Sequence, residues 1–316
     1  MKTLRLSPDD TGLAAASMLL DQGQTVAIPT ETVYGLAGDA RNGAAVAAIY
    51  TAKGRPGFNP LIVHVADLAA AEVIALLSPE ARALARAFWP GALTLVLPLR
   101  PDSGIASLVT AGLETVAVRV PAAEAAQALL RRFGGPLAAP SANASGRISP
   151  TTADHVLDPD GGLDGRIAAV LDAGPCPVGL ESTIIGWQGD QPALLRPGGL
   201  PAEAIEAALG RPLARHQGDP SAPSAPGQLS SHYAPRAPLR LNAAAPRPGE
   251  TYLDFARPGP FSLSPGGDLT EAAANLFDLL HRADRIGRPI AVAPIPDHGL
   301  GAAINDRLRR AAAPRP

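Results

Sequence analysis

Residues 25–65 constrain the fold of this 316-residue chain more than any other stretch. They open with a short apolar run, residues 25–28, which is typical of a buried strand and ends at Pro29. Polar residues follow at once, among them Thr32, and binding residues tend to lie in loops at the ends of strands. The sequence therefore predicts a polar loop held at the edge of a sheet.

Two cations and a histidine follow in the same stretch. After a predicted helix at residues 42–51, Lys53 and Arg55 lie on a turn with only a glycine between them. His64 lies in a second predicted strand, residues 61–65, where alternation places it opposite its apolar neighbours. Taken singly, such a turn is more often solvated, and such a histidine is more often a core or surface group. Taken together, they indicate a cleft that binds an anion.

Helices and strands mix along residues 1–210 without regular alternation. Predicted helices cover residues 8–22, with Ser7 as the N-cap, and residues 67–77, 78–90, 122–133 and 202–209. Predicted strands cover residues 93–97, 115–120, 137–139, 167–172 and 183–187. This order favours an α/β fold with a twisted mixed sheet of parallel and antiparallel strands and packed helices, rather than a Rossmann domain.

A second candidate site lies at residues 140–146, a run of small polar residues and glycine that contains Ser141 and Asn143. Such a loop exposes backbone N–H groups that bind phosphate or a hydrated magnesium ion, or it is an ordinary solvated turn. Composition alone does not decide between the two.

Residues 211–238 are predicted to form a linker. Prolines at positions 212, 220, 223, 226, 235 and 238 exclude a helix or a central strand. Within this segment Tyr233 either docks on a binding site or only attaches the linker to a domain surface. Residues 239–316 then form a small α/β domain, with helices at residues 270–284 and 300–312, that should lean on the first domain for stability.

Composition excludes several classes of function. The net charge is −2, so any contact with RNA needs a local basic patch. The single cysteine, Cys176, allows no internal disulfide, and no spacing of cysteine and histidine is typical of zinc, so we expect no metal held by side chains alone. With no signal peptide and no apolar run long enough to span a membrane, we expect a cytoplasmic protein without membrane contact.

Several motifs resemble, in order and spacing, those of the YrdC-like threonylcarbamoyl-AMP synthase family. They are PTETVYGLAGDA, KGRPGFNPLIVHV, FWPGALTLVLP, VAVRVPA, APSANASGRISPT, GLESTIIGW and LLRPGG. The segments SPGGDLTEAAANLFDLLHRAD and GLGAAINDRLRRAA further resemble the two-domain members of that family. The resemblance covers nearly the whole chain and implies a YrdC-like catalytic domain followed by a small Rossmann-like domain.

The resemblance also implies an activity. The enzyme would condense L-threonine, bicarbonate or CO2, and ATP with its magnesium to L-threonylcarbamoyl-AMP and pyrophosphate, as a nucleotidyltransferase with no tightly bound organic cofactor. The product would feed N6-threonylcarbamoyladenosine synthesis next to the tRNA anticodon, through a downstream tRNA threonylcarbamoyl transferase complex. A threonine carbamate is already anionic, so its attack on the α-phosphate needs positioning and charge neutralisation more than a general base.

The family motifs imply a role for individual residues. Lys53 and Arg55 are implied to be catalytic. The residues implied to bind ATP are Arg55, Asn59, Thr115, Ser141, Asn143, Ser149, Arg196 and Tyr233. Those implied to bind L-threonine are Thr32, His64, Arg119, Ala139 through its backbone, and Ser182. Taken singly, Thr32, Arg119 and Ser182 also read as a turn residue, a surface pair and a cap.

The sequence departs from the family pattern in two places, and two alternative functions remain open. Residues 228–231 read QLSS where the family usually carries basic and aromatic residues, and the chain is shorter than usual between Phe255 and Ser264. One alternative is a non-catalytic module that binds double-stranded RNA or tRNA, or an enzyme with a weak RNA contact of this kind. The other is the carbamoyl-adenylate domain of hydrogenase maturation proteins, whose accompanying zinc-finger modules need cysteines that this chain lacks.

Overall fold

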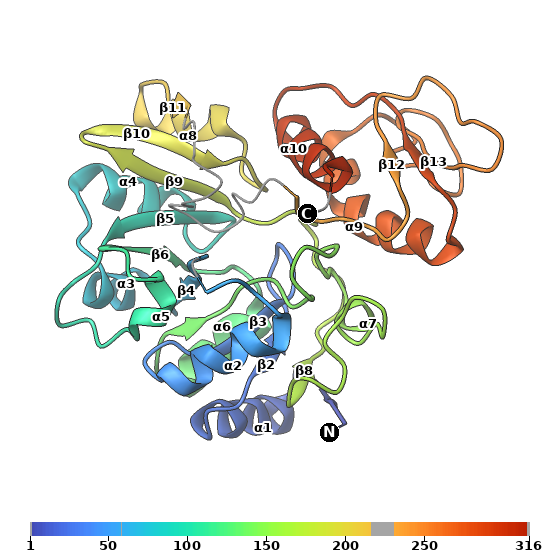
Figure 1. The fold of residues 1–316 in the computed structure, drawn as a ribbon. Coiled ribbons are helices and arrows are strands. Elements are labelled where there is room, and N and C mark those ends of the chain that lie inside the picture. The colour runs from blue at the N-terminus through green and yellow to red at the C-terminus, as the bar shows by residue number, and fades with distance from the viewer. Residues whose placement is uncertain (1, 58, 216–230, 315–316) are drawn as a thin grey trace.

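One mixed sheet organises the first two thirds of the protein (Figure 1). The computed structural model describes residues 2–57, 59–215 and 231–314, and within these ranges eleven strands form this sheet. They are β1 (Leu4–Leu6), β2 (Val26–Ile28), β3 (Gly35–Asp39), β4 (Ile62–His64), β5 (Leu93–Pro98), β6 (Thr115–Arg119), β7 (Leu137–Ala138), β8 (Ala169–Leu171), β9 (Thr183–Gln188), β10 (Gln191–Arg196) and β11 (Ala214–Arg215). Their order across the sheet is β1-β8-β2-β3-β7-β4-β6-β5-β9-β10-β11.

Parallel and antiparallel pairs share this sheet, which confirms the predicted mixed α/β fold. Strand β4 runs parallel to β6, and β5 runs parallel to β9, whereas β7 is antiparallel to both of its neighbours. In the β4–β6 pair His64 lies opposite Arg119. Residues separated by many positions in the chain therefore meet at the carboxyl ends of these two strands.

Helices cover both faces of the sheet. They are α1 (Asp10–Asp21), α2 (Gly43–Lys53), α3 (Leu68–Ile74), α4 (Pro79–Phe88), α5 (Ser107–Thr110), α6 (Glu124–Phe133), α7 (Ala153–Val156) and α8 (Ala202–Leu209). Alternate residues of β2 point to opposite faces. Val26 and Ile28 pack in a core with α1 and α6, whereas Ala27 packs in a separate core that includes α2.

Some elements differ from their predicted bounds. The N-cap of α1 is Asp9 rather than Ser7, because the Asp9 side chain accepts the hydrogen bond from the backbone N–H of Gly12. The helix predicted at residues 67–77 ends at Ile74, where the backbone becomes extended and Ala75 bridges to Leu99. Strand β3 was not predicted, since its sequence, GLAGD, is rich in glycine, which is depleted in strands.

The C-terminal unit is a parallel sheet with two long helices. Its strands β12 (Leu239–Arg240), β13 (Thr251–Leu253) and β14 (Ile290–Val292) lie in the order β12-β14-β13, with helices α9 (Leu269–Ile286) and α10 (Leu300–Ala312) packed on them. The apolar core of this unit extends to Val33, Ile148 and Leu180 of the first unit. The small unit is therefore supported by its larger neighbour.

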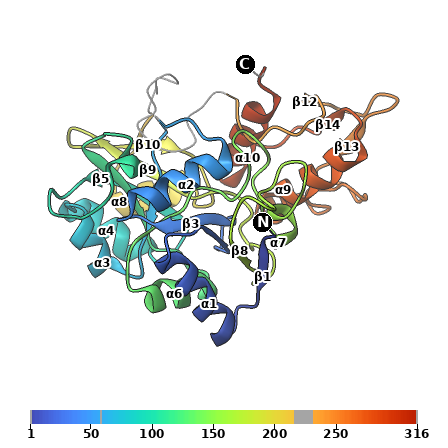
Figure 2. The same ribbon diagram turned by 60° about the horizontal axis from the view of Figure 1, so that its bottom comes forward.

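Helix α9 lies beside α7 of the first unit in both views (Figures 1 and 2). The imidazole ring of His155 on α7 stacks on that of His281 on α9, with ring centroids 3.9 Å apart. Of the predicted linker, residues 211–215 and 231–238 are described, and residues 228–230 of the QLSS departure lie outside the described residues. No helix in the described part of the chain is long and apolar enough to span a membrane.

Candidate functional site

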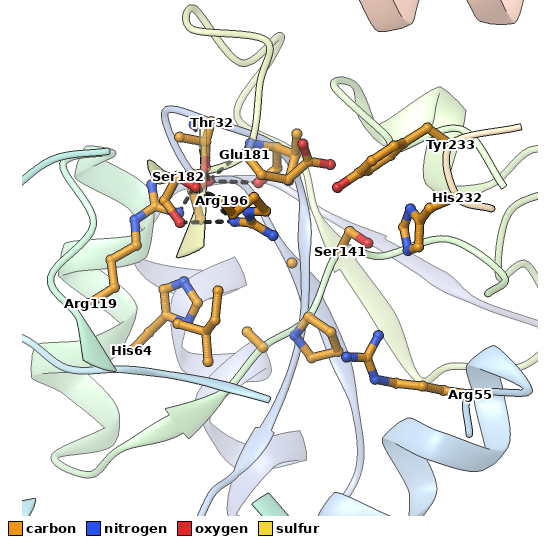
Figure 3. Close-up of a pocket in the computed structure, with 16 residues that line it drawn as sticks. Thr32, Arg55, His64, Arg119, Ser141, Glu181, Ser182, Arg196, His232 and Tyr233 are labelled. Atoms are coloured by element: carbon orange, nitrogen blue, oxygen red, sulfur yellow. Dashed lines mark hydrogen bonds between the residues drawn. The ribbon is translucent and has the colours of Figure 1, made fainter. Parts of the chain in front are cut away.

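A pocket opens where several strands of the large sheet end (Figure 3). His64 and Arg119 end the parallel strands β4 and β6, Ser182 precedes β9, and Arg196 ends β10. His64 also pairs with Leu137 of β7, which packs in the core with α1 and α6. Because paired residues point to the same face of a sheet, the pocket lies on the face that α1 and α6 cover further along.

Nine of the residues predicted for the site line this pocket. They are Thr32, Arg55, His64, Arg119, Ala139, Ser141, Ser182, Arg196 and Tyr233. Figure 3 shows two groups: Thr32, His64, Arg119 and Ser182 lie on one side, and Arg55, Ser141 and Tyr233 lie on the other. The structure thus brings most of the predicted set together and separates it into two halves.

On the first side, Arg119 and Glu31 form a buried ion pair. Arg119 Nη2 donates to Glu31 Oε1 at 2.6 Å, Nη1 donates to Thr32 Oγ1 at 2.8 Å, and Nε donates to the carbonyl of Gly91 at 3.1 Å. Burial alone would raise the pKa of Glu31, but the charge and hydrogen bonds of Arg119 outweigh it and lower that pKa. Glu31 is therefore ionised and fixes the orientation of the guanidinium group.

His64 is a neutral group in this pocket. Burial and the neighbouring charge of Arg119 lower the pKa of His64 to about 3. Its Nδ1 atom is buried and has no hydrogen-bond partner in the described structure. An uncharged imidazole with an unpaired nitrogen is suited to a hydrogen bond with a ligand.

Ser182 is held from two directions. Its hydroxyl group shares a hydrogen bond of 2.7 Å with the Thr94 hydroxyl, in which either oxygen can donate. Its carbonyl oxygen accepts from Arg196 Nη2 at 2.8 Å and from Nε at 3.2 Å. Burial lowers the pKa of Arg196. The guanidinium group of Arg196 thus orders the start of β9 from inside the pocket.

On the second side, Arg55 is a half-buried cation. Its Nη2 donates to the carbonyl of Pro60 at 2.9 Å and its Nε to the carbonyl of Asn59 at 3.3 Å, and no carboxylate among the described residues pairs with it. Burial lowers the pKa of Arg55 to about 10, so the group stays charged at neutral pH. A guanidinium group that faces a pocket without an acidic partner is suited to an anionic ligand.

Lys53 lies behind the pocket rather than in its wall. It is buried, and its Nζ donates hydrogen bonds of 2.6 Å to the carbonyl oxygens of Ser141 and Asn143. The Asn143 side chain in turn donates to the carbonyls of Ala144 and Arg147. Lys53 therefore shapes the 140–146 loop, and a direct contact with a triphosphate stays a prediction.

Three further predicted residues lie away from the pocket surface. Asn59 and Ser149 are buried, and Ser149 Oγ donates to Glu181 Oε1 at 2.5 Å. Thr115 lies on the same face of β6 as Arg119 but at the other end of the strand, because residues i and i+4 share a face. It lines a second cavity, together with Trp187 and Arg211.

Tyr233, from the linker segment, forms the wall opposite Arg119 in Figure 3. It is fully buried, its backbone has a φ of 63°, and its hydroxyl group has no hydrogen-bond partner in the described structure. Its ring contacts the ring of His232 edge-on at a centroid distance of 4.1 Å and lies 5.7 Å from that of Phe277 on α9. Tyr233 thus packs against both units of the protein.

Sequence reasoning assigned no binding role to Glu31, which pairs with Arg119 but does not line the pocket, or to Glu181 and His232, which do line it. The first two lie inside motifs that were identified, one position before Thr32 and one before Ser182. A buried carboxylate needs a cation partner, and neither partner is visible locally in the sequence. The sequence did offer one signal for these glutamates, since each lies near a strand end, directly before a predicted site residue.

Unpaired polar atoms concentrate at this site. The buried side-chain atoms without a partner in the described structure are Asn59 Nδ2 and Oδ1, His64 Nδ1, Asn143 Oδ1, His232 Nδ1, Tyr233 Oη, Ser262 Oγ and Arg307 Nη2. All except Ser262 belong to the pocket or to the residues directly behind it. Since buried polar groups are normally hydrogen-bonded, this concentration indicates a site for polar ligands. No group of three or more His, Cys, Asp or Glu among the described residues is arranged to hold a metal ion.

Comparison with known proteins gives matches over nearly the whole chain. Residues 18–198 match the protein family described as telomere recombination, and residues 200–313 match the threonylcarbamoyl-AMP synthase C-terminal domain. A threonylcarbamoyl-AMP synthase of Bacillus subtilis is 43% identical over 99% of this chain and 96% of its own length, and one of Pyrococcus abyssi is 41% identical over 94% and 92%. The crystal structure of P. abyssi Sua5 complexed with L-threonine superposes with a TM-score of 0.88 and 37% identity, covering 99% of this chain and 98% of the other.

Proposed function

This chain belongs to the threonylcarbamoyl-AMP synthase family, and we propose that its pocket is where L-threonine, bicarbonate or CO2, and ATP condense to L-threonylcarbamoyl-AMP and pyrophosphate. The enzyme is a nucleotidyltransferase whose product serves the N6-threonylcarbamoyladenosine modification of tRNA next to the anticodon. We place this reaction in the cytoplasm, before a tRNA threonylcarbamoyl transferase complex that consumes the product.

The observation that carries the proposal is the division of the pocket into two halves. Arg119, Thr32, His64 and Ser182 offer a cation and short polar groups, which suit the carboxylate and hydroxyl group of L-threonine. Ala139 also lines the pocket. Across from them lies a half suited to a nucleotide.

The nucleotide half combines a cation with a loop and an aromatic ring. We assign the triphosphate to Arg55 and Arg196, since a guanidinium group can donate two parallel hydrogen bonds to a pair of phosphate oxygens. We assign the rest of ATP to the residues of the second half and its supporting layer, Asn59, Ser141, Asn143, Ser149 and Tyr233. Thr115 is left out of this assignment, because it lines a different cavity at the other end of β6. Magnesium enters as part of the ATP complex, where phosphate oxygens and water supply most of its ligands.

The residues support a reaction that depends on charge neutralisation. The threonine amine takes up CO2 and loses a proton to become a carbamate. A carbamate oxygen then forms a bond to the α-phosphorus of ATP, and the bond from that phosphorus to the pyrophosphate oxygen breaks. Because the attacking oxygen is already anionic, the reaction depends on positioning and on charge neutralisation by fixed cations more than on a general base.

The test is pyrophosphate release from ATP and bicarbonate with different amino acids. Threonine should support release, and serine should be roughly 5- to 150-fold poorer because one missing methyl group is worth about 1 to 3 kcal/mol. Valine should fail more severely, since it leaves the hydroxyl-binding groups of the pocket unpaired. Release that does not depend on an amino acid would overturn the proposed function, and equal rates with valine and threonine would overturn a hydroxyl-binding pocket.

A non-catalytic RNA-binding role makes a different prediction. It requires tight binding of tRNA without ATP, through contacts with phosphates that weaken steeply as salt is raised. A gel-shift assay with tRNA at physiological salt distinguishes the two functions. Tight binding together with no threonine-dependent release of pyrophosphate would favour the RNA-binding role over the enzyme.

A further inference from the structure

Arg307 is a fully buried arginine that the C-terminal unit places beside the pocket. It lies on α10, and its Nε donates to Glu181 Oε2 at 2.7 Å. Its Nη1 donates to the carbonyl of Pro197 at 2.9 Å and to Asp306 Oδ2 at 2.8 Å, whereas Nη2 has no partner in the described structure. A residue close to the end of the chain thus contacts a carboxylate that lines the pocket.

The same guanidinium group lies over the ring of Tyr233. Its central carbon is 5.1 Å from the ring centroid, a distance at which a cation is attracted to the aromatic face. Tyr233 and Glu181 lie next to each other in the pocket wall (Figure 3). Arg307 is therefore in contact with two neighbouring residues of the wall at once.

Glu181 depends on this arginine for its charge. Burial alone would raise the pKa of Glu181, but the charges of Arg307 and then Arg196 outweigh it and lower that pKa. The ionised carboxylate accepts from Ser149 Oγ at 2.5 Å. The carbonyl oxygen of Ser149 in turn lies 3.2 Å from Nε2 of His281 on α9. Two helices of the C-terminal unit thus reach the same wall of the pocket.

We propose that Arg307 is a positioning residue for the nucleotide half of the pocket, acting through Glu181 and Tyr233. It keeps the carboxylate ionised to hold Ser149, and it fixes the tyrosine ring. The C-terminal unit thereby completes the site. The proposal rests on the proposed function in one respect, the assignment of Ser149 and Tyr233 to ATP.

A role that only holds the two units together does not account for this geometry. The two units already share an apolar core through Val33, Ile148 and Leu180. A buried ion pair adds little net stability compared with apolar residues of the same volume, so Arg307 is better explained by the orientation it imposes. Arg309, on the same helix, is exposed and serves as a matched control.

The test is calorimetric binding of α,β-methylene ATP to the full chain, combined with separate KM values for ATP and threonine. Arg307→Gln should weaken binding of the analogue by at least about tenfold and raise the ATP KM in parallel, with the threonine KM within about twofold of wild type. Arg307→Lys keeps the positive charge but not the planar guanidinium group, so its affinity for the analogue should lie between those of wild type and Arg307→Gln. Arg309→Gln should bind like wild type. The double variant Glu181→Gln with Arg307→Gln should lose clearly less binding free energy than the two single variants lose in sum, because the two residues act as a unit, and strictly additive losses would contradict action through Glu181.

The outcomes separate the inference from the proposed function. Wild-type protein that fails to bind the analogue would overturn the proposed function and this inference with it. Normal binding by wild type together with unchanged affinity in Arg307→Gln would overturn the inference alone, as would an equal rise in both KM values. If Arg307→Gln does not fold, Arg307→Lys decides, since an affinity within about twofold of wild type in that variant contradicts a role for the guanidinium geometry.

Discussion

Lys53 on α2 donates a 2.6 Å hydrogen bond from its Nζ to the carbonyl oxygen of Ser141, which lies 88 positions later in the chain. A second bond of 2.6 Å goes to the carbonyl of Asn143. Both acceptors belong to the loop that forms part of the pocket wall, and Lys53 itself is buried beneath it. The lysine therefore acts on the site through the backbone of this loop.

Lys53→Met should loosen the loop. The two carbonyl oxygens lose their donor, and the loop that presents Ser141 is no longer fixed, so we expect the ATP KM to rise by about tenfold with the threonine KM little changed. Steady-state kinetics with each substrate varied in turn measures the effect. Thr51→Ala changes an exposed residue of the same helix and is the control. A variant in which only the threonine KM changes would contradict this role.

Arg55→Ala should nearly abolish pyrophosphate release. Arg55 is a pocket cation without a carboxylate partner among the described residues, and removing such a group from a site that works by charge neutralisation costs roughly 10² to 10³ in kcat/KM. The exposed Arg86 on α4 provides the control, as Arg86→Ala should turn over like wild type. Wild-type turnover by Arg55→Ala would remove this residue from the mechanism.

Local sequence signals predicted the elements that carry the site. Helix α2 is an example, since the Asn42 side chain caps it by accepting from the N–H groups of Ala44 and Ala45, and Gly54 ends it in the left-handed conformation with a φ of 60°. The strands predicted at residues 61–65 and 115–120 contain β4 and β6, which end one residue earlier, at His64 and Arg119. These features depend on residues within a few positions of one another.

Features that depend on distant residues were not predicted. The position of Lys53 is set by carbonyl groups of a loop that only the folded sheet brings near. The ion pair of Glu181 joins residues that are 126 positions apart, and that of Arg119 joins residues 88 apart. Neither pair has a periodic signature, because burial and partner choice are properties of the tertiary structure.

Arg119→Lys should act mainly on threonine. A lysine keeps a cation beside Glu31, but its three N–H donors cannot serve the four acceptors Glu31, Thr32, Gly91 and a ligand carboxylate at once, so the threonine KM should rise by about ten- to a hundredfold. Arg119→Ala should in addition lower the free energy of unfolding by about 3 to 5 kcal/mol, because it leaves Glu31 buried without its cation. Kinetics and denaturant unfolding measure the two effects separately. An effect on the ATP KM alone would contradict the assignment.

Buried histidines should make stability depend on pH. Burial lowers the pKa of His64, His232 and His281 to about 3, whereas these groups have their ordinary value of 6.5 in the unfolded chain. Between these values the unfolded state binds more protons than the folded state, so stability rises with pH in this window and falls as pH is lowered. Glu31 and Glu181, with lowered pKa values, lose their contribution only below about 4.5 and do not explain a change above pH 5.

The free energy of unfolding should therefore fall by several kcal/mol between pH 7.5 and pH 5, about 2 kcal/mol for each of the three histidines. His64→Gln removes one of these groups and should reduce the fall by about 2 kcal/mol, whatever its effect on stability at pH 7.5. His298→Gln, at an exposed position, is the control. Denaturant unfolding at the two pH values measures the difference. An equal fall in wild type and His64→Gln would show that His64 is protonated in the folded protein at pH 5, contrary to the neutral imidazole inferred for the pocket.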